Sequence, residues 1–176
     1  MPEHDPDLLE RLENCRQNPF EGTVYRVVWP DRSPTEGSSV ARARWNSPDN
    51  TFEVLNKSLT SEGAAAEFEA FWSLFEQRPD RPALSWTLTA RLRRVVSLDS
   101  RQLEELGIRR ADYARRDYTR TQEISSALSY LGCHGLIVPS ARYDCRNLVV
   151  YVRNLDSDCS VDETSSSAFN WSGPTI

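Results

Sequence analysis

The sequence predicts a single compact domain of the α+β class. Its 176 residues match the size of one ordinary domain, and 39% are hydrophobic while 27% are charged, which is a globular composition. Helical and strand-like segments mix irregularly along the chain, which favours α+β over a doubly wound parallel sheet. The longest apolar run, 148–152, is strand-sized and well short of the roughly 18 residues that a membrane span needs. We therefore expect no membrane contact.

The first 21 residues predict a short helical extension ahead of the main domain. Three leucines at helical spacing give an apolar stripe over residues 5–16, and Asp5 before Pro6 is a typical helix start. The same stretch is rich in acidic residues and lacks an apolar block, so it does not resemble a secretory signal. These features predict a cytoplasmic protein.

The next segments predict strands, a loop and one long helix. A β-branched segment at 23–29 predicts a strand that ends at Pro30, and residues 30–43 have the composition of a loop. A short extended piece at 44–46 and a strand at 52–55 follow. Alanines and aromatic residues at helical spacing then predict a helix over 60–77, capped by Thr60 or Ser61.

The second half predicts further strands and two helices. Residues 83–98 hold one or two strands, and Asp99 or Ser100 caps a short helix that ends at Gly107. Thr119 with Gln122 is a capping-box pattern that opens a helix ending at Gly132.

Two buried strands and a tail complete the prediction. Strands are expected at 136–138 and 148–152, and the acidic, serine-rich residues from 157 onward have the composition of a tail. The predicted domain therefore spans 22–155, after an N-terminal helical extension at 1–21 and before a flexible tail at 156–176.

The charge balance argues against a nucleic-acid-binding protein. The formal net charge is −5, although residues 81–120 hold ten arginines against five acids. No helix-turn-helix, zinc-finger or RNP pattern accompanies these arginines. They therefore indicate a solvated face or a contact surface for an acidic partner. The four cysteines lie far apart, so we expect reduced thiols and no metal site.

Four short motifs carry the remaining chemistry. Gly-rich phosphate loops, HExxH and GxSxG motifs are all absent from the sequence. The chain instead has Tyr25-Arg26 in a strand, Ala43-Arg44-Trp45-Asn46 before a turn and Glu67 three residues after Ala64. The fourth motif is Val138-Pro139-Ser140-Ala141-Arg142, followed by Asn147-Leu148-Val149. In this order, over about residues 22–155, the chain resembles the RES domain family, named for a polar Arg–Glu–Ser trio.

The resemblance implies a fold, an activity and a partner. RES domains are similar to ADP-ribosyltransferases in fold, and many are toxins paired with an Xre-like antitoxin protein. They act on NAD as a substrate, by glycohydrolysis or phosphorolysis of the nicotinamide–ribose bond or by transferring ADP-ribose to a protein. The family's functional positions fall on Arg26, Arg44, Glu67 and Ser140. Tyr25 and Asn56 join them in the implied ligand-binding set.

The chain departs from the family at two of these places. The family usually has a tyrosine where this chain has Asn56, and a Gly-Gly pair where it has Arg42-Ala43. An asparagine cannot stack on the nicotinamide, so either Trp45 or Phe52 supplies the ring, or the activity is weak. A RES-like binding module with little catalysis is the third interpretation.

The residue types suit the implied chemistry, and each also has a structural alternative. Arginines bind a pyrophosphate with bidentate charged hydrogen bonds, and a carboxylate such as Glu67 stabilises an oxocarbenium-like ribose. Taken singly, Arg26 fits a surface or ion-pair residue, Arg44 a stack on an aromatic ring, Glu67 a solvated helix face and Ser140 a turn. Together they favour the family, and we expect all four around one cleft.

Overall fold

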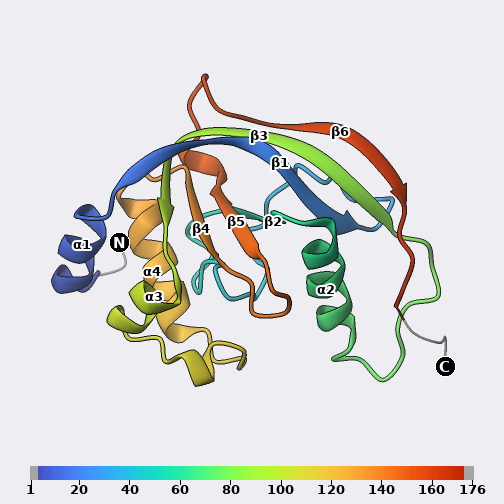
Figure 1. Ribbon diagram of the computed structural model, residues 1–176, viewed down its shortest axis with the longest axis horizontal. Coiled ribbons are helices and arrows are strands. Elements are labelled where there is room, and N and C mark those ends of the chain that lie inside the picture. The colour runs from blue at the N-terminus through green and yellow to red at the C-terminus, as the bar shows by residue number, and fades with distance from the viewer. Residues whose placement is uncertain (1–3, 173–176) are drawn as a thin grey trace.

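The computed structural model describes residues 4–172, which form one α+β domain, as predicted. The domain is built around a barrel-like sheet (Figure 1). The strands follow one another in space in the order β1-β2-β5-β4-β3-β6, and β1 also pairs with β3, which closes the sheet. All neighbouring pairs are antiparallel except β3 with β4. The strands are β1 (Gln17–Val28), β2 (Val54–Ser58), β3 (Leu84–Ser97), β4 (Gly135–Pro139), β5 (Arg146–Tyr151) and β6 (Ser160–Ala168).

Alternation along the short strands divides the apolar residues between two cores. On β5, Leu148 and Val150 pack with Leu55, Leu88 and other residues inside the closed sheet. Val149 and Tyr151 face the opposite way and join the larger core beneath three helices. Those helices are α1 (Pro6–Glu13), α3 (Ser100–Glu105) and α4 (Thr119–Tyr130), which lie together on one side of the molecule (Figure 1). The two short 3-10 helices are Arg110–Asp112 and Val152–Asn154.

The remaining helix, α2 (Ser61–Trp72), lies on the other side of the short strands (Figure 1). Thr60 caps it by accepting a hydrogen bond from the Gly63 amide at 3.0 Å. A Cβ atom at Gly63 would collide with Ser58 and Cys145, so glycine allows the first turn to approach β2 closely. The apolar side of α2 packs through Phe68 on a ring cluster that also contains Trp29, Phe169 and Trp171.

Several predicted helix starts are confirmed and one is wrong. Asp5 caps α1, and Asp99 forms a complete capping box with Gln102 at the start of α3. Gly107, after α3, has a φ of 93°, which glycine adopts without strain. The capping box expected from Thr119 does not form, because Asp117 accepts hydrogen bonds from both the amide and the hydroxyl of that residue.

Other boundaries also differ from the prediction. β1 begins at Gln17 because residues 17–22 pair with β3, so the expected domain boundary at 21/22 falls inside a strand. The expected helix over 60–77 ends at Trp72, and the expected extended piece at 44–46 consists of turns and bends. Residues 83–98 hold one continuous strand.

The largest difference is β6, which occupies much of the predicted flexible tail. Residues 160–168 are mostly exposed serines and acids, and the strand exists because its backbone pairs with β3 from Arg91 to Leu84. Phe169, directly after it, is buried in the ring cluster beside α2. Residues 173–176 of the predicted tail lie outside the described part of the chain. Within residues 4–172, none of the helices has the length and apolarity required to cross a membrane.

Candidate active site

A cavity of about 620 Å³ lies between α2, the loop before Asn46, the segment around Tyr113 and the turn that joins β4 to β5. Its lining includes Tyr25, Arg26, Arg44, Asn56 and Glu67, while Ser140 lies between the lining residues Pro139 and Ala141. The structure therefore brings all six predicted site residues to one region, although Arg26 and Ser140 are 140 − 26 = 114 positions apart in the sequence.

Glu67 is held at the cavity wall by residues from the sheet. The Ser140 hydroxyl donates to Glu67 Oε1 at 2.7 Å, and Asn147 Nδ2 donates to the same oxygen at 2.9 Å. Ser140 Oγ itself accepts from the amides of Arg142 and Tyr143 at 3.1 and 3.3 Å, which fixes the hydroxyl on its turn. Glu67 is thus an oriented, half-buried carboxylate rather than part of a solvated helix face.

Asn147 was not among the predicted site residues, although it belongs to the fourth motif. Its Oδ1 atom is buried and has no hydrogen-bond partner within the described residues, while its Nδ2 binds Glu67. An unpaired buried acceptor is costly. Its position beside the carboxylate gives the cavity one further polar group that suits a ligand.

Arg44 lies against two tyrosine rings. Its guanidinium carbon is 4.6 Å from the Tyr113 ring centre and 4.9 Å from that of Tyr118. The Tyr113 hydroxyl donates to the Pro139 carbonyl at 2.7 Å, and burial raises the pKa of Tyr113 to about 12. Burial lowers the pKa of Arg44, which stays a cation near neutral pH. The stack on an aromatic ring, which was the structural alternative for Arg44, is therefore present, and its rings are those of Tyr113 and Tyr118.

Arg26 is half-buried at the cavity wall rather than fully exposed. Its NH1 group donates to the carbonyl oxygens of Pro34 and Glu36 at 3.2 and 2.8 Å, so it ties the loop after β1 to the cavity wall. Burial lowers its pKa to about 10. Lys57, 3% exposed, donates to the same Pro34 carbonyl, and burial with the nearby Arg26 charge lowers its pKa to about 6. Lys57 is therefore mainly neutral at pH 7, and Arg26 is charged.

Asn56 lines the cavity through an amide pair. Its Nδ2 donates to Asn46 Oδ1 at 3.0 Å, and the buried Asn46 donates to the Ser38 carbonyl at 3.2 Å. Of the two proposed substitute rings, Trp45 lines the cavity. Phe52 was a wrong candidate, because it is buried in the core against Tyr151, with ring centres 6.1 Å apart.

The cavity carries a large excess of positive charge. Glu67 is the only acid among its lining residues. The arginines that line it are Arg26, Arg42, Arg44, Arg116 and Arg142. In the part of the chain that the structure describes, none of the five forms an ion pair with a carboxylate. Unpaired guanidinium groups that converge on one cavity favour an anionic ligand.

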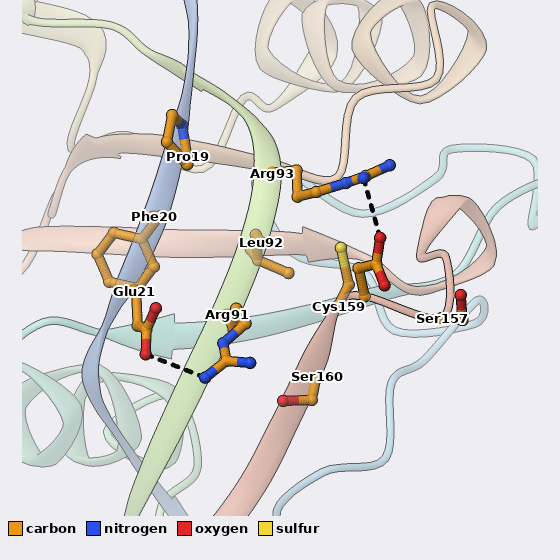
Figure 2. Close-up of a pocket in the computed structure, with 10 residues that line it drawn as sticks. Pro19, Phe20, Glu21, Arg91, Leu92, Arg93, Ser157, Cys159 and Ser160 are labelled. Atoms are coloured by element: carbon orange, nitrogen blue, oxygen red, sulfur yellow. Dashed lines mark hydrogen bonds and ion pairs between the residues drawn. The ribbon is translucent and has the colours of Figure 1, made fainter.

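A second cavity, of about 530 Å³, has paired arginines instead (Figure 2). Arg91 binds Glu21 at 3.2 Å, and Arg93 binds Asp156 and Asp158 at 2.7 and 3.0 Å. Carboxylates of the same chain already compensate these two charges, so this cavity attracts an anion less than the first one does.

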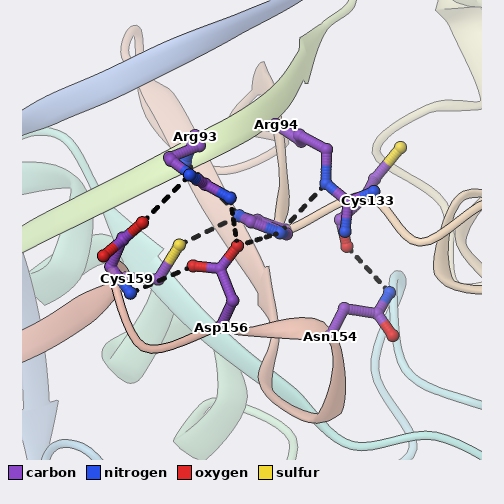
Figure 3. Close-up of polar contacts among 8 residues, drawn as sticks. Arg93, Arg94, Cys133, Asn154, Asp156 and Cys159 are labelled. Carbon is purple, nitrogen blue, oxygen red and sulfur yellow. Dashed lines mark hydrogen bonds and ion pairs between the residues drawn. The ribbon is translucent and has the colours of Figure 1, made fainter.

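Beside the second cavity, His134, Asp156 and Cys159 form a cluster whose ligand atoms lie within 4.8 Å of one another (Figure 3). Cys159 Sγ is 3.0 Å from His134 Nδ1. Two guanidinium groups already donate to the atoms that a metal would use, Arg94 to His134 Nε2 at 3.0 Å and Arg93 to Asp156. The cluster is therefore part of a network of hydrogen bonds and ion pairs in which Arg93 and Arg94 of β3 bind His134 and the turn before β6.

Comparison with known proteins identifies the family of the chain. The family model described as "RES domain" matches residues 23–172, most of the chain. The chain belongs to the RES domain family. This RES domain is also similar in fold to a chain in the crystal structure of the M. tuberculosis MbcT–MbcA toxin–antitoxin complex. The TM-score is 0.81 at 19% identity, covering 94% of this chain and 93% of the other. No curated protein matches this RES domain at a significant level.

Proposed function

We propose that this RES domain consumes NAD by cleaving the bond between nicotinamide and ribose. The observation that carries the proposal is the pairing of one oriented carboxylate, Glu67, with five unpaired arginines around a single cavity. NAD has the matching features, a pyrophosphate that needs cationic donors and a ribose that becomes positively charged as nicotinamide leaves.

The proposed roles follow from where each group lies. After burial and the two tyrosines, the Arg142 charge lowers and the Glu67 charge raises the pKa of Arg44. Arg44 therefore lies near both groups, and Arg44 and Arg142 are suited to the pyrophosphate next to the reacting ribose. Arg26 shapes the wall and keeps further N–H groups for the ligand. Glu67 stabilises the oxocarbenium-like ribose, and Ser140 and Asn147 hold that carboxylate in place, which lowers the cost of reorganisation during the reaction.

The acceptor of the ribose decides which reaction takes place. Water gives ADP-ribose, inorganic phosphate gives ADP-ribose 1″-phosphate, and a protein side chain gives a labelled protein. We favour cleavage with water or phosphate, because the polar groups in the cavity surround one carboxylate and many cations. Protein ADP-ribosylation is the second candidate, and a binding module with little catalysis is the third, favoured by Asn56.

One experiment separates the three. Purified protein is incubated with NAD labelled in the adenine, with and without phosphate and with a cell lysate, and products are identified by chromatography and mass spectrometry. Free nicotinamide with ADP-ribose or its 1″-phosphate supports the proposal. Label on protein supports transfer, and tight binding of intact NAD without products supports the binding module.

The proposal includes a toxin role and a protein antitoxin. The fold is similar to that of a chain in a toxin–antitoxin complex, and depletion of NAD would halt growth of a cell that makes the protein in its cytoplasm. Expression alone should therefore stop growth, while expression with an Xre-like protein from a neighbouring gene should restore it. Growth arrest that persists in Glu67→Gln would exclude NAD consumption as the cause.

A further inference from the structure

The cavity has more cations than the pyrophosphate of NAD requires. Five arginines against one glutamate give a charge of about 5 − 1 = +4, with Lys57 left out because it is mainly neutral. A pyrophosphate carries about two negative charges, and the nicotinamide ring of NAD carries one positive charge. Two or more guanidinium groups are therefore left without a counter-charge when NAD fills the cavity.

The surplus arginines lie at the outer part of the cavity. Arg44 and Arg142 are the half-buried pair near Glu67, whereas Arg42 and Arg116 are exposed. Arg116 donates only to the Ala70 carbonyl at 3.4 Å, and no hydrogen bond or ion pair involves the Arg42 side chain within residues 4–172. These two guanidinium groups are thus free to receive an anion from solvent.

The wall beside Arg116 suits a purine. Ala70, whose carbonyl Arg116 contacts, precedes Phe71, and both Phe71 and Leu74 line the cavity although they are 52% and 50% exposed. Exposed apolar side chains at the rim of a polar cavity offer a surface on which a flat base can stack. With the reacting ribose at Glu67, the adenosine end of a dinucleotide would reach this rim.

We propose that the cavity prefers NADP to NAD, with Arg42 and Arg116 binding the 2′-phosphate of the adenosine ribose. This inference rests on the proposed function. A phosphate monoester adds about 1.5 to 2 negative charges near neutral pH, which matches the surplus.

The test compares the two dinucleotides through their common product, nicotinamide. The values of kcat/KM for NADP and NAD are measured for wild type, Arg42→Ala and Arg116→Ala. Arg101→Ala is the control, because Arg101 is exposed on α3 and pairs with Glu105, away from the cavity. We expect wild type to favour NADP about tenfold or more, and each cavity variant to lower that ratio about tenfold, as the loss of a charge-assisted hydrogen bond would. Equal use of both dinucleotides, a preference for NAD, or a ratio that the variants leave unchanged would overturn the inference.

Two further measurements distinguish a failure of this inference from a failure of the proposed function. If neither dinucleotide releases nicotinamide, the proposed function fails, and calorimetry with ADP-ribose and 2′-phospho-ADP-ribose still tests the subsite. Tighter binding of the 2′-phosphorylated compound that is lost in Arg42→Ala supports the inference, and equal binding refutes it. If inorganic phosphate accelerates NAD cleavage and Arg42→Ala abolishes that effect, Arg42 binds free phosphate and the 2′-phosphate assignment is wrong.

Discussion

Glu67→Gln removes one negative charge from the cavity while keeping the shape of the side chain. The glutamine Oε1 can still accept from Ser140 and Asn147, which donate to Glu67 at 2.7 and 2.9 Å. What is lost is the charge that the transition state needs and the ground state does not. Loss of one preorganised electrostatic contact at the reacting centre typically lowers kcat about 100- to 1,000-fold, or about 2.7 to 4 kcal/mol. We expect KM to change less than about threefold.

The assay is steady-state release of nicotinamide from the preferred dinucleotide. Glu62→Gln is the matched control, since Glu62 is an exposed acid in the first turn of the same helix, and it should keep wild-type kcat. Thermal unfolding of both variants checks that the fold is intact. A kcat within about threefold of wild type, or a rise in KM at constant kcat, would remove Glu67 from the transition state.

Three other substitutions test the surroundings of the site. Asn56→Tyr should lower KM about two- to twelvefold in nicotinamide-release assays, because a ring at the cavity wall adds roughly 0.5–1.5 kcal/mol of stacking. Gly63→Ala should lower the free energy of unfolding by about 1–3 kcal/mol in urea denaturation and also lower kcat, because the new methyl collides with Ser58 and Cys145 and displaces α2. Lys57→Met should flatten the pH dependence of stability. Burial and the Arg26 charge hold the Lys57 pKa at about 6, against 10.5 for an ordinary lysine. Between these two pH values the unfolded chain binds one more proton than the folded chain, so wild-type stability rises with pH by up to about 1.4 kcal/mol per unit.

Each of these predictions has a result that contradicts it. An unchanged KM in Asn56→Tyr would mean that the nicotinamide does not reach β2. Gly22→Ala, whose new methyl meets only the tip of the Phe20 ring at 3.3 Å, is the control for Gly63→Ala. Equal stability of the two alanine variants would refute the close approach of α2. For Lys57→Met, denaturation at about pH 7 and about pH 9 should give a smaller difference than wild type, and an equal difference would mean that Lys57 is charged in the folded chain.

The sequence allowed prediction of those parts of the fold that depend on local signals. Asp5, Thr60 and Asp99 cap helices because a side-chain oxygen satisfies a nearby amide, and that pairing is visible within three residues. β6 could not be predicted in this way. Its serines and acids lack an apolar pattern, and the strand is stabilised by backbone pairing with β3, which lies about 75 residues away.

In the candidate site, too, local signals could be predicted from the sequence and long-range contacts could not. Arg26, Arg44, Glu67 and Ser140 could be named from short motifs. The contacts that give them their roles are long-range, such as Ser140 to Glu67 across 73 positions. Tyr113 belongs to none of these motifs, and its contact with Arg44 depends on how the segment after the 3-10 helix Arg110–Asp112 lies against the cavity.

The most direct test of the account is a crystal structure of the Glu67→Gln variant with bound dinucleotide. We predict electron density in the 620 Å³ cavity, with the pyrophosphate in contact with Arg44 and Arg142 and the nicotinamide ribose beside position 67. Density in the second cavity between Arg91 and Arg93, or an empty first cavity at saturating dinucleotide, would contradict it.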